Sequence, residues 1–127
     1  MTPRRRTDPA AGRDAVRRWA ADPGAAGRDV VATAVRWSLE ELAARHPGNT
    51  CEVRVPPFGV VQCLPGPRHT RGTPPNVVET DAATWLALVT GAQQWAPAVA
   101  SGRVSASGER ADLTDLLPLL PTAVPES

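Results

Sequence analysis

The sequence predicts one α+β domain, and three features of the 127-residue chain lead to this class. Apolar residues recur at helical spacing in the first third of the chain, whereas apolar and polar residues alternate from Cys51 to Val55 as in a half-buried strand. Turns rich in Gly and Pro separate the segments. The resulting order is helices, hairpin, strand, helices, strand and helix, which fits an α+β domain. A domain of this length buries about two thirds of its unfolded surface, so it can form one sizeable core.

A first helix is expected after a flexible basic tail at residues 1–7. Asp8 caps the free N–H groups of this helix, and the proline that follows suits the first helical position. The helix then runs to about Ala21, where an Asp-Pro-Gly sequence ends it.

A second helix is expected at residues 30–45, with Asp29 as its cap. Its surface offers two ion pairs at a spacing of four residues, Arg36 with Glu40 and Glu41 with Arg45. One face of this helix is apolar and is formed by Val31, Val35, Leu39 and Leu42.

The strands are expected to follow these helices. Residues 51–55 and 60–64 pair as a hairpin across a turn that contains Pro and Gly. The stretch 65–75 is too rich in Pro and Gly for a regular element and is expected to be a loop. Residues 76–80 form a short third strand, and residues 103–107 form the last one.

Helices are expected on either side of that last strand. Asp81 caps a helix that ends at Gly91, because a glycine can adopt the left-handed conformation that closes a helix. Residues 95–101 form a short helix, and residues 111–117 form a terminal helix that Pro118 ends.

Composition excludes several classes of protein. No apolar run approaches the ~20 residues of a membrane-spanning helix, so an integral membrane segment is not expected. The basic start is not followed by the apolar stretch of a signal peptide, which favours a cytoplasmic location. All 14 basic residues are Arg, but the formal net charge is only +1, so a nucleic-acid partner is not expected.

Motifs for catalysis are also missing. Two Cys and two scattered His are too few for a metal site. The sequence contains no nucleophile elbow and no phosphate-cradling glycine motif. We therefore expect neither enzymatic activity nor a cofactor. Cys51 and Cys63 lie on the two arms of the predicted hairpin and could be near each other across it, and in a reducing compartment both are expected to be free, buried thiols.

Two groups of residues are candidates for ligand binding. In the loop, Arg68, His69 and Arg71 could bind a carboxylate or phosphate, because they combine positive charge with hydrogen-bond donors. The short helices that flank a small sheet can leave room for an apolar ligand. The candidate residues of such a cavity are Phe58, Trp85, Leu88, Trp95, Leu113, Leu116 and Leu117.

From Cys51 onward the chain resembles the actinobacterial branch of the sterol-carrier-protein-like domains. The resemblance lies in the segment VRVPPFGVVQCLPGPRHTRGTPPNVVETD, and further on in TWLALVTG and VASGRVSASGERADLTDLLPL. It implies a mixed sheet of four to five strands, covered by helices and enclosing an apolar tunnel for lipids. The domain would span residues 29–120, preceded by an N-terminal helix and linker at 8–28 and followed by a flexible tail at 121–127.

The resemblance implies a non-enzymatic protein that binds or transfers a lipid or another apolar small molecule. An alternative is an accessory domain like those fused to mycothiol-dependent enzymes. In that case a polar anionic thiol would bind through Arg68, His69 and Arg71. The two hypotheses differ in whether the apolar side chains leave a cavity or fill one another. The sequence leaves this question and the oligomeric state open.

Overall fold

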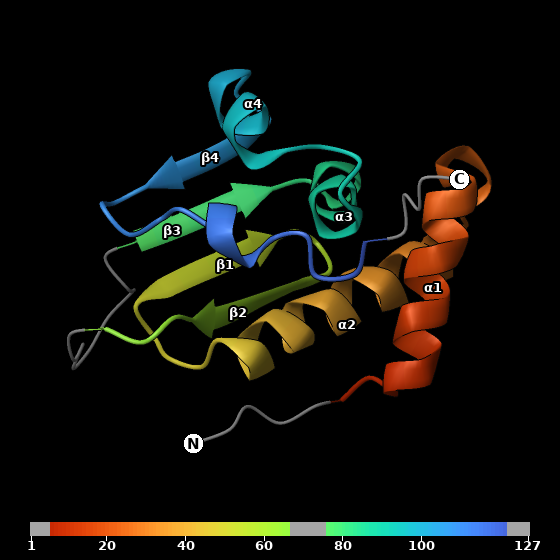
Figure 1. Cartoon of the computed structure of the whole chain (residues 1–127). Coiled ribbons are helices and arrows are strands. Elements are labelled where there is room, and N and C mark those ends of the chain that lie inside the picture. The colour runs from red at the N-terminus through yellow and green to blue at the C-terminus, as the bar shows by residue number, and fades with distance from the viewer. Residues whose placement is uncertain (1–5, 67–75, 122–127) are drawn as a thin grey trace.

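The computed structural model describes residues 6–66 and 76–121 (Figure 1). Within these residues the elements follow in the order α1 (Pro9–Ala21), η1 (Pro23–Ala25), α2 (Arg28–Arg45), β1 (Cys51–Val55), β2 (Gly59–Cys63), β3 (Asn76–Thr80), α3 (Ala82–Thr90), α4 (Trp95–Ala100), β4 (Val104–Ser107) and η2 (Thr114–Leu116), where η marks a short 3-10 turn. The predicted α+β class is confirmed.

The strands form one mixed sheet in the order β2-β1-β3-β4. β1 pairs antiparallel with β2 and parallel with β3, and β3 pairs antiparallel with β4. Because side chains alternate along a strand, the paired Val53 and Val78 are both fully buried, whereas the paired Arg54 and Glu79 reach solvent. The sheet thus has one buried face and one polar face.

Helices cover the buried face. α2 packs against β2, and both α1 and α3 pack against α2 (Figure 1). The close approach of α1 to α2 depends on Gly12, because a Cβ at this position would overlap the ring of Trp37. Val16 and Trp19 of α1 belong to the same core as the strands, so α1 is an integral part of the domain.

Two of the three caps predicted for helix N-termini are present in the structure. Asp8 accepts a hydrogen bond from Ala11 N at 3.0 Å, and Asp81 accepts one from Thr84 N at 2.7 Å, so both predicted caps are confirmed. The predicted cap at Asp29 is wrong. α2 begins earlier, with Gly27 as its N-cap. Asp29 lies in the first turn, where its negative charge stabilises the helix by interacting with the positive end of the helix dipole.

The predicted terminal helix at residues 111–117 is also wrong, because only the 3-10 turn η2 forms there. The backbone N–H of Thr114 donates to the side chain of Asp112 instead of to a helical carbonyl. Pro118 follows directly and cannot continue a helix. The segment therefore crosses the domain as an extended chain with a single turn.

Candidate functional site

The clearest candidate binding site is a pocket of about 380 Å³ between α3, α4 and the segment that follows β4. Ligand pockets in proteins usually measure about 300–1,000 Å³, so this volume suits a small ligand. We call it the α3–α4 pocket. Its lining residues are Leu88, Gly91, Gln93, Gln94, Trp95, Ala96, Thr114, Leu117 and Pro118.

The end of α3 shapes one wall of this pocket. Gly91 closes the helix with a φ of 88°, in the left-handed region that glycine adopts without strain. The chain then turns back, and Gln93 N donates to the carbonyl oxygen of Ala87 at 3.1 Å. As a result Leu88 of α3 and Trp95 of α4 face the same space.

The segment after β4 forms the opposite wall. Leu113 is fully buried in the core, and Leu120 N donates to the carbonyl oxygen of Val89 at 3.0 Å. The bond to Val89 holds the segment against α3, and the burial of Leu113 anchors it in the core. Leu117 and Pro118 lie between them in the sequence and line the pocket.

Thr114 forms a polar part of the pocket wall. Its backbone N–H and its hydroxyl both donate to Oδ1 of Asp112, at 2.9 and 2.6 Å. Hydrogen bonds from the Thr114 hydroxyl, and then from its backbone, hold the pKa of Asp112 below the usual carboxyl value. The ionised form of Asp112 therefore fixes Thr114 in η2.

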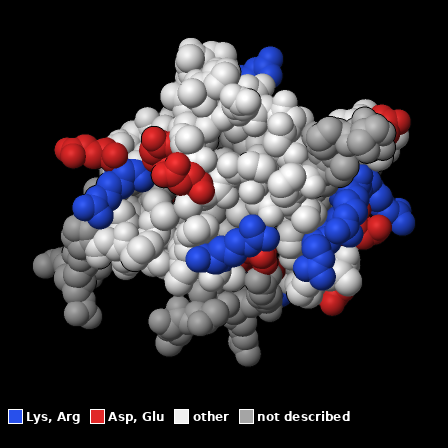
Figure 2. Space-filling view, viewed as in Figure 1, with Lys and Arg blue, Asp and Glu red and all other residues white. Residues whose placement is uncertain are grey.

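The α3–α4 pocket is uncharged: among the described residues, no Asp, Glu or Arg side chain lines it. In the view of Figure 2, charged side chains surround an uncharged area over α3. Apolar side chains line much of the pocket, and Gln93, Gln94 and Thr114 add a few hydrogen-bonding groups. Such a lining can bind a largely apolar molecule by removing its surface from water.

The residues predicted for an apolar cavity fall into separate places. Leu88, Trp95 and Leu117 come together in the α3–α4 pocket. Trp85 and Leu113 are fully buried in the core and do not line it. Leu116, which precedes Leu117 in the sequence, is partly buried and packs against the core, and it does not line the pocket.

Trp85 has a visible role in the core. Its Nε1 donates to the hydroxyl oxygen of Ser38 at 2.8 Å, and Ser38 Oγ in turn donates to the carbonyl oxygen of Val35 at 2.9 Å. Within this series of hydrogen bonds the buried indole N–H of Trp85 and the hydroxyl of Ser38 each have a partner, which is what a buried tryptophan requires. The contact fixes α3 against α2.

Phe58 lies away from this pocket, in a second one of about 550 Å³ between α2 and β2. The guanidinium carbon of Arg28 lies 5.5 Å from the centre of the Phe58 ring, and Arg36 Nε donates to the carbonyl oxygen of Phe58 at 3.4 Å. We call this second pocket the α2–β2 pocket. Its lining residues are Arg6, Thr7, Arg36, Leu39, Glu40, Phe58, Gly59, Val60 and Val61.

Glu40 of this pocket does not make the ion pair expected from the sequence. Its Oε1 accepts from Thr7 N at 3.0 Å and from Arg6 N at 3.3 Å, while its Oε2 accepts from the Thr7 hydroxyl at 3.3 Å. The other expected pair forms, with Arg45 Nε 2.6 Å from Glu41 Oε2. Glu40 thus ties the start of the described chain to α2.

Sequence reasoning missed several pocket residues. In the α3–α4 pocket these are Gly91, Gln93, Gln94, Ala96, Thr114 and Pro118, and the α2–β2 pocket as a whole was not expected. One signal could have pointed to the first group. A glycine that closes one helix just before a tryptophan that opens the next brings the residues between them onto one turn.

Two other predictions concern the loop and the cysteines. Arg68, His69 and Arg71 lie outside the described residues. Cys51 and Cys63 are directly opposite each other in the β1–β2 register, are fully buried and carry free thiols. A hydrogen bond to Cys51 and burial both raise the pKa of the Cys63 thiol.

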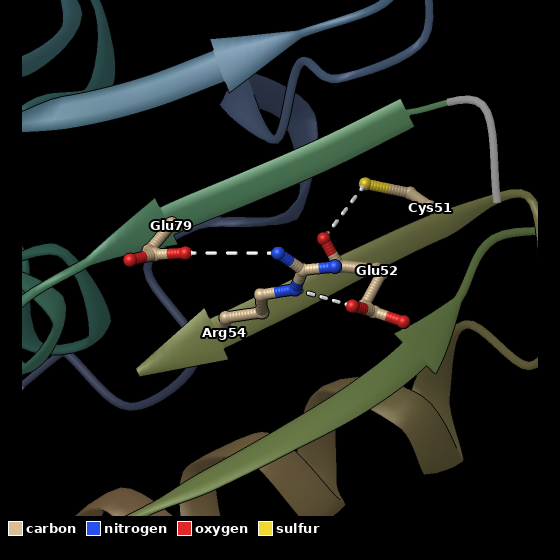
Figure 3. A network of polar contacts seen from close by, with 4 residues as sticks. All are labelled: Cys51, Glu52, Arg54 and Glu79. Carbon is tan, nitrogen blue, oxygen red and sulfur yellow. Dashed lines mark hydrogen bonds and ion pairs between the residues drawn. The ribbon is translucent and has the colours of Figure 1, made fainter. Parts of the chain in front are cut away.

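The polar face of the sheet carries a charged cluster. Figure 3 shows Arg54 of β1 between Glu52 of the same strand and Glu79 of β3. Arg54 Nε pairs with Glu52, and its Nη1 lies 3.8 Å from Glu79 Oε1. These pairs reach solvent, so each contributes little to stability.

In residues 6–66 and 76–121, no three His, Cys, Asp or Glu side chains gather in a way that could hold a metal ion. No helix in the same ranges combines the length and hydropathy needed to cross a bilayer.

Comparison with known proteins bears on the fold and on the pocket together. The search of curated proteins finds no match to this chain. A family model described as "Bacterial SCP ortholog", where SCP is sterol carrier protein, matches residues 27–119. The matched part includes α2, all the strands of the described sheet and the whole lining of the α3–α4 pocket. The chain therefore belongs to the bacterial sterol-carrier-protein-like family.

Proposed function

We propose that this protein binds or transfers a lipid or another apolar small molecule in the α3–α4 pocket and catalyses no reaction on it. The observation that carries the proposal is the lining, which combines Leu88, Trp95 and Leu117 with a few uncharged polar groups. Burying apolar surface is worth about 25 cal/mol per Å², so an apolar ligand needs few further contacts. Membership of the sterol-carrier-protein-like family supports a carrier role.

The proposal extends to location, partners and domain bounds. The low net charge supports the absence of a nucleic-acid partner. The location that we propose is cytoplasmic, where a reducing environment keeps Cys51 and Cys63 as free thiols. We take residues 29–120 as the ligand-binding domain and expect α1, which shares its core, to be needed for stability.

The test uses the fluorescence of Trp95, which lies in the pocket wall and is 9% exposed. Titration of the full chain with decan-1-ol, a neutral single-chain probe, is expected to give a saturable shift in the micromolar range. Replacing Trp95 with Phe is expected to remove most of this shift while binding persists by calorimetry.

Two neighbouring leucines provide a matched pair of variants. Leu117→Arg places a charge in the pocket and is expected to weaken decan-1-ol binding at least tenfold, because a charge in an apolar site is costly. Leu116→Arg makes the same change on a partly buried side chain outside the lining, and is expected to leave binding within about twofold.

Equal losses in the two leucine variants would contradict the proposal, as would the lack of any saturable response to decan-1-ol, a fatty acyl thioester or a sterol. Saturable binding of an anionic thiol that is lost in the double variant Arg68→Gln, Arg71→Gln would instead favour the loop as the binding site.

A further inference from the structure

We propose that the α2–β2 pocket binds a single-chain amphiphile with an anionic head group, such as an alkyl carboxylate or alkyl phosphate. It shares no lining residue with the α3–α4 pocket. The inference therefore concerns a second site and does not depend on the function proposed for the first.

The positive charge of this pocket comes from arginines on two segments. Arg36 of α2 and Arg6 both line it. Arg36 uses its Nε to hold the carbonyl oxygen of Phe58, and no carboxylate of the described ranges lies within 4.0 Å of its guanidinium. A guanidinium that has further N–H groups can bind a carboxylate or a phosphate in bidentate fashion.

The acidic side chain in the lining, Glu40, offsets one of the two arginines, so the lining keeps a net positive charge. Both carboxylate oxygens of Glu40 are engaged, by the backbone N–H groups of Arg6 and Thr7 and by the hydroxyl of Thr7. Three donors therefore stabilise the Glu40 carboxylate without using the Arg36 side chain. Arg28, whose guanidinium lies over the Phe58 ring, adds a further positive charge near the site.

An apolar surface lies beside these charges. Leu39 is almost fully buried at the base of the pocket, and Phe58 and Val61 are partly buried. Val60 is 56% exposed, although it is a large apolar residue on the same wall. An alkyl chain laid over Val60 and Leu39 would remove this surface from water, while its head group reaches Arg36.

The exposed apolar residues favour a single small amphiphile over a lipid surface. Among the described residues, Val60 and Val99 are the exposed large hydrophobic side chains, and they lie on different elements, β2 and the short helix α4. A surface that inserts into a bilayer needs a continuous apolar face. A pocket of about 550 Å³ with an arginine in its wall matches one chain with one charged end.

The test is calorimetric titration of the full-length Leu117→Glu protein, in which the α3–α4 pocket carries a negative charge that repels anions, with decanoate and decyl phosphate. Decan-1-ol serves as the neutral probe of the same chain length. Arg36→Gln is expected to weaken binding of both anions about tenfold and to leave any binding of decan-1-ol unchanged. The matched control is Arg103→Gln, which makes the same change on an exposed side chain just before β4, at the opposite edge of the sheet.

A second measurement, of amide chemical shifts, locates decanoate on the protein. Amide chemical shifts on adding decanoate to the wild-type chain are expected to move at Phe58–Val61 and at residue 36, and in Arg36→Gln this movement should need about tenfold more decanoate.

The inference is overturned if decanoate and decyl phosphate do not bind, or if Arg36→Gln and Arg103→Gln have equal effects. It is also overturned if decanoate shifts only the residues of the α3–α4 pocket, a result that would leave the proposed function intact. Binding of the protein to phosphatidylglycerol vesicles without binding of monomeric decanoate would identify a lipid surface as the partner and would likewise overturn it.

Discussion

Trp85 and Ser38 are far apart in the sequence but share a hydrogen bond in the centre of the core. The indole Nε1 lies 2.8 Å from the Ser38 hydroxyl oxygen, and both side chains are fully buried. This bond joins α3, which forms a wall of the α3–α4 pocket, to α2, which forms a wall of the α2–β2 pocket. One polar contact thus connects the elements that carry both candidate sites.

Replacing Ser38 with Ala is expected to destabilise the fold by about 1–3 kcal/mol, because it leaves the buried Trp85 N–H without a partner. Urea unfolding measures the change as a shift in midpoint with an unchanged slope. A double variant with Trp85→Phe should lose less than the sum of the two single variants. Fully additive losses would show that the two side chains do not interact.

Gly12→Ala is expected to cost about 1–3 kcal/mol, because the added Cβ overlaps the Trp37 ring and forces α1 away from α2. Gly24→Ala is the control, since the nearest atom to its added Cβ is Asp22 Oδ1 at 3.7 Å. Thermal unfolding of both variants checks this prediction. A similar melting temperature for the two variants would mean that the helix contact tolerates the methyl group.

Stability is expected to fall at alkaline pH through Cys63. The hydrogen bond to Cys51, and then burial, raise the pKa of this thiol in the folded state above the ordinary value of 9.0. Above that value the unfolded chain loses the thiol proton while the folded chain keeps it, so the free energy of unfolding declines by about 1.4 kcal/mol per pH unit for this one group. Unfolding at pH 8 to 10 measures the decline, and Cys63→Ala should flatten it. An equally steep decline in that variant would point to other groups.

Acid is expected to loosen the wall of the α3–α4 pocket through Asp112. Because the pKa of Asp112 is lowered by its bonds to Thr114, these bonds persist above the ordinary carboxyl value of 3.8 and are lost as pH falls through the lowered pKa. Asp112→Ala should therefore reduce affinity for decan-1-ol severalfold at neutral pH. Asp115→Ala, in the same turn, should not. Equal affinities in the two variants would show that Thr114 needs no such support.

The sequence predicted those parts of the fold that depend on neighbouring residues. The caps at Asp8 and Asp81 and the stop at Gly91 are local, because each side chain or φ angle acts on the adjacent turn. The terminal helix was wrong for a related reason. Its three leucines suggested helical spacing, but the side chain of Asp112 took the N–H of Thr114 that a helix would have used.

The candidate sites depend on contacts between distant residues and were harder to predict. Leu88, Trp95 and Leu117 were expected to lie near a ligand, yet the companion residue Thr114 is placed there only by the path of the chain after β4. The partner of Glu40 was likewise decided by tertiary structure. Arg36 lies one helical turn away, but the N–H groups of Arg6 and Thr7 approach Glu40 from another part of the chain.

The strand order also bears on how the chain reaches this structure. β1 and β2 are a local hairpin, whereas Cys51 also lies opposite Asn76, and Val77 lies opposite Ser107. Closing the longer loops costs more chain entropy, so the hairpin and α2 are expected to form before β3 and β4 add to the sheet. Truncating Val61 to Ala should then slow refolding, and truncating Val104 should mainly speed unfolding. Because β3 leads directly into α3, the α3–α4 pocket would be completed late, after the walls of the α2–β2 pocket that α2 and β2 form.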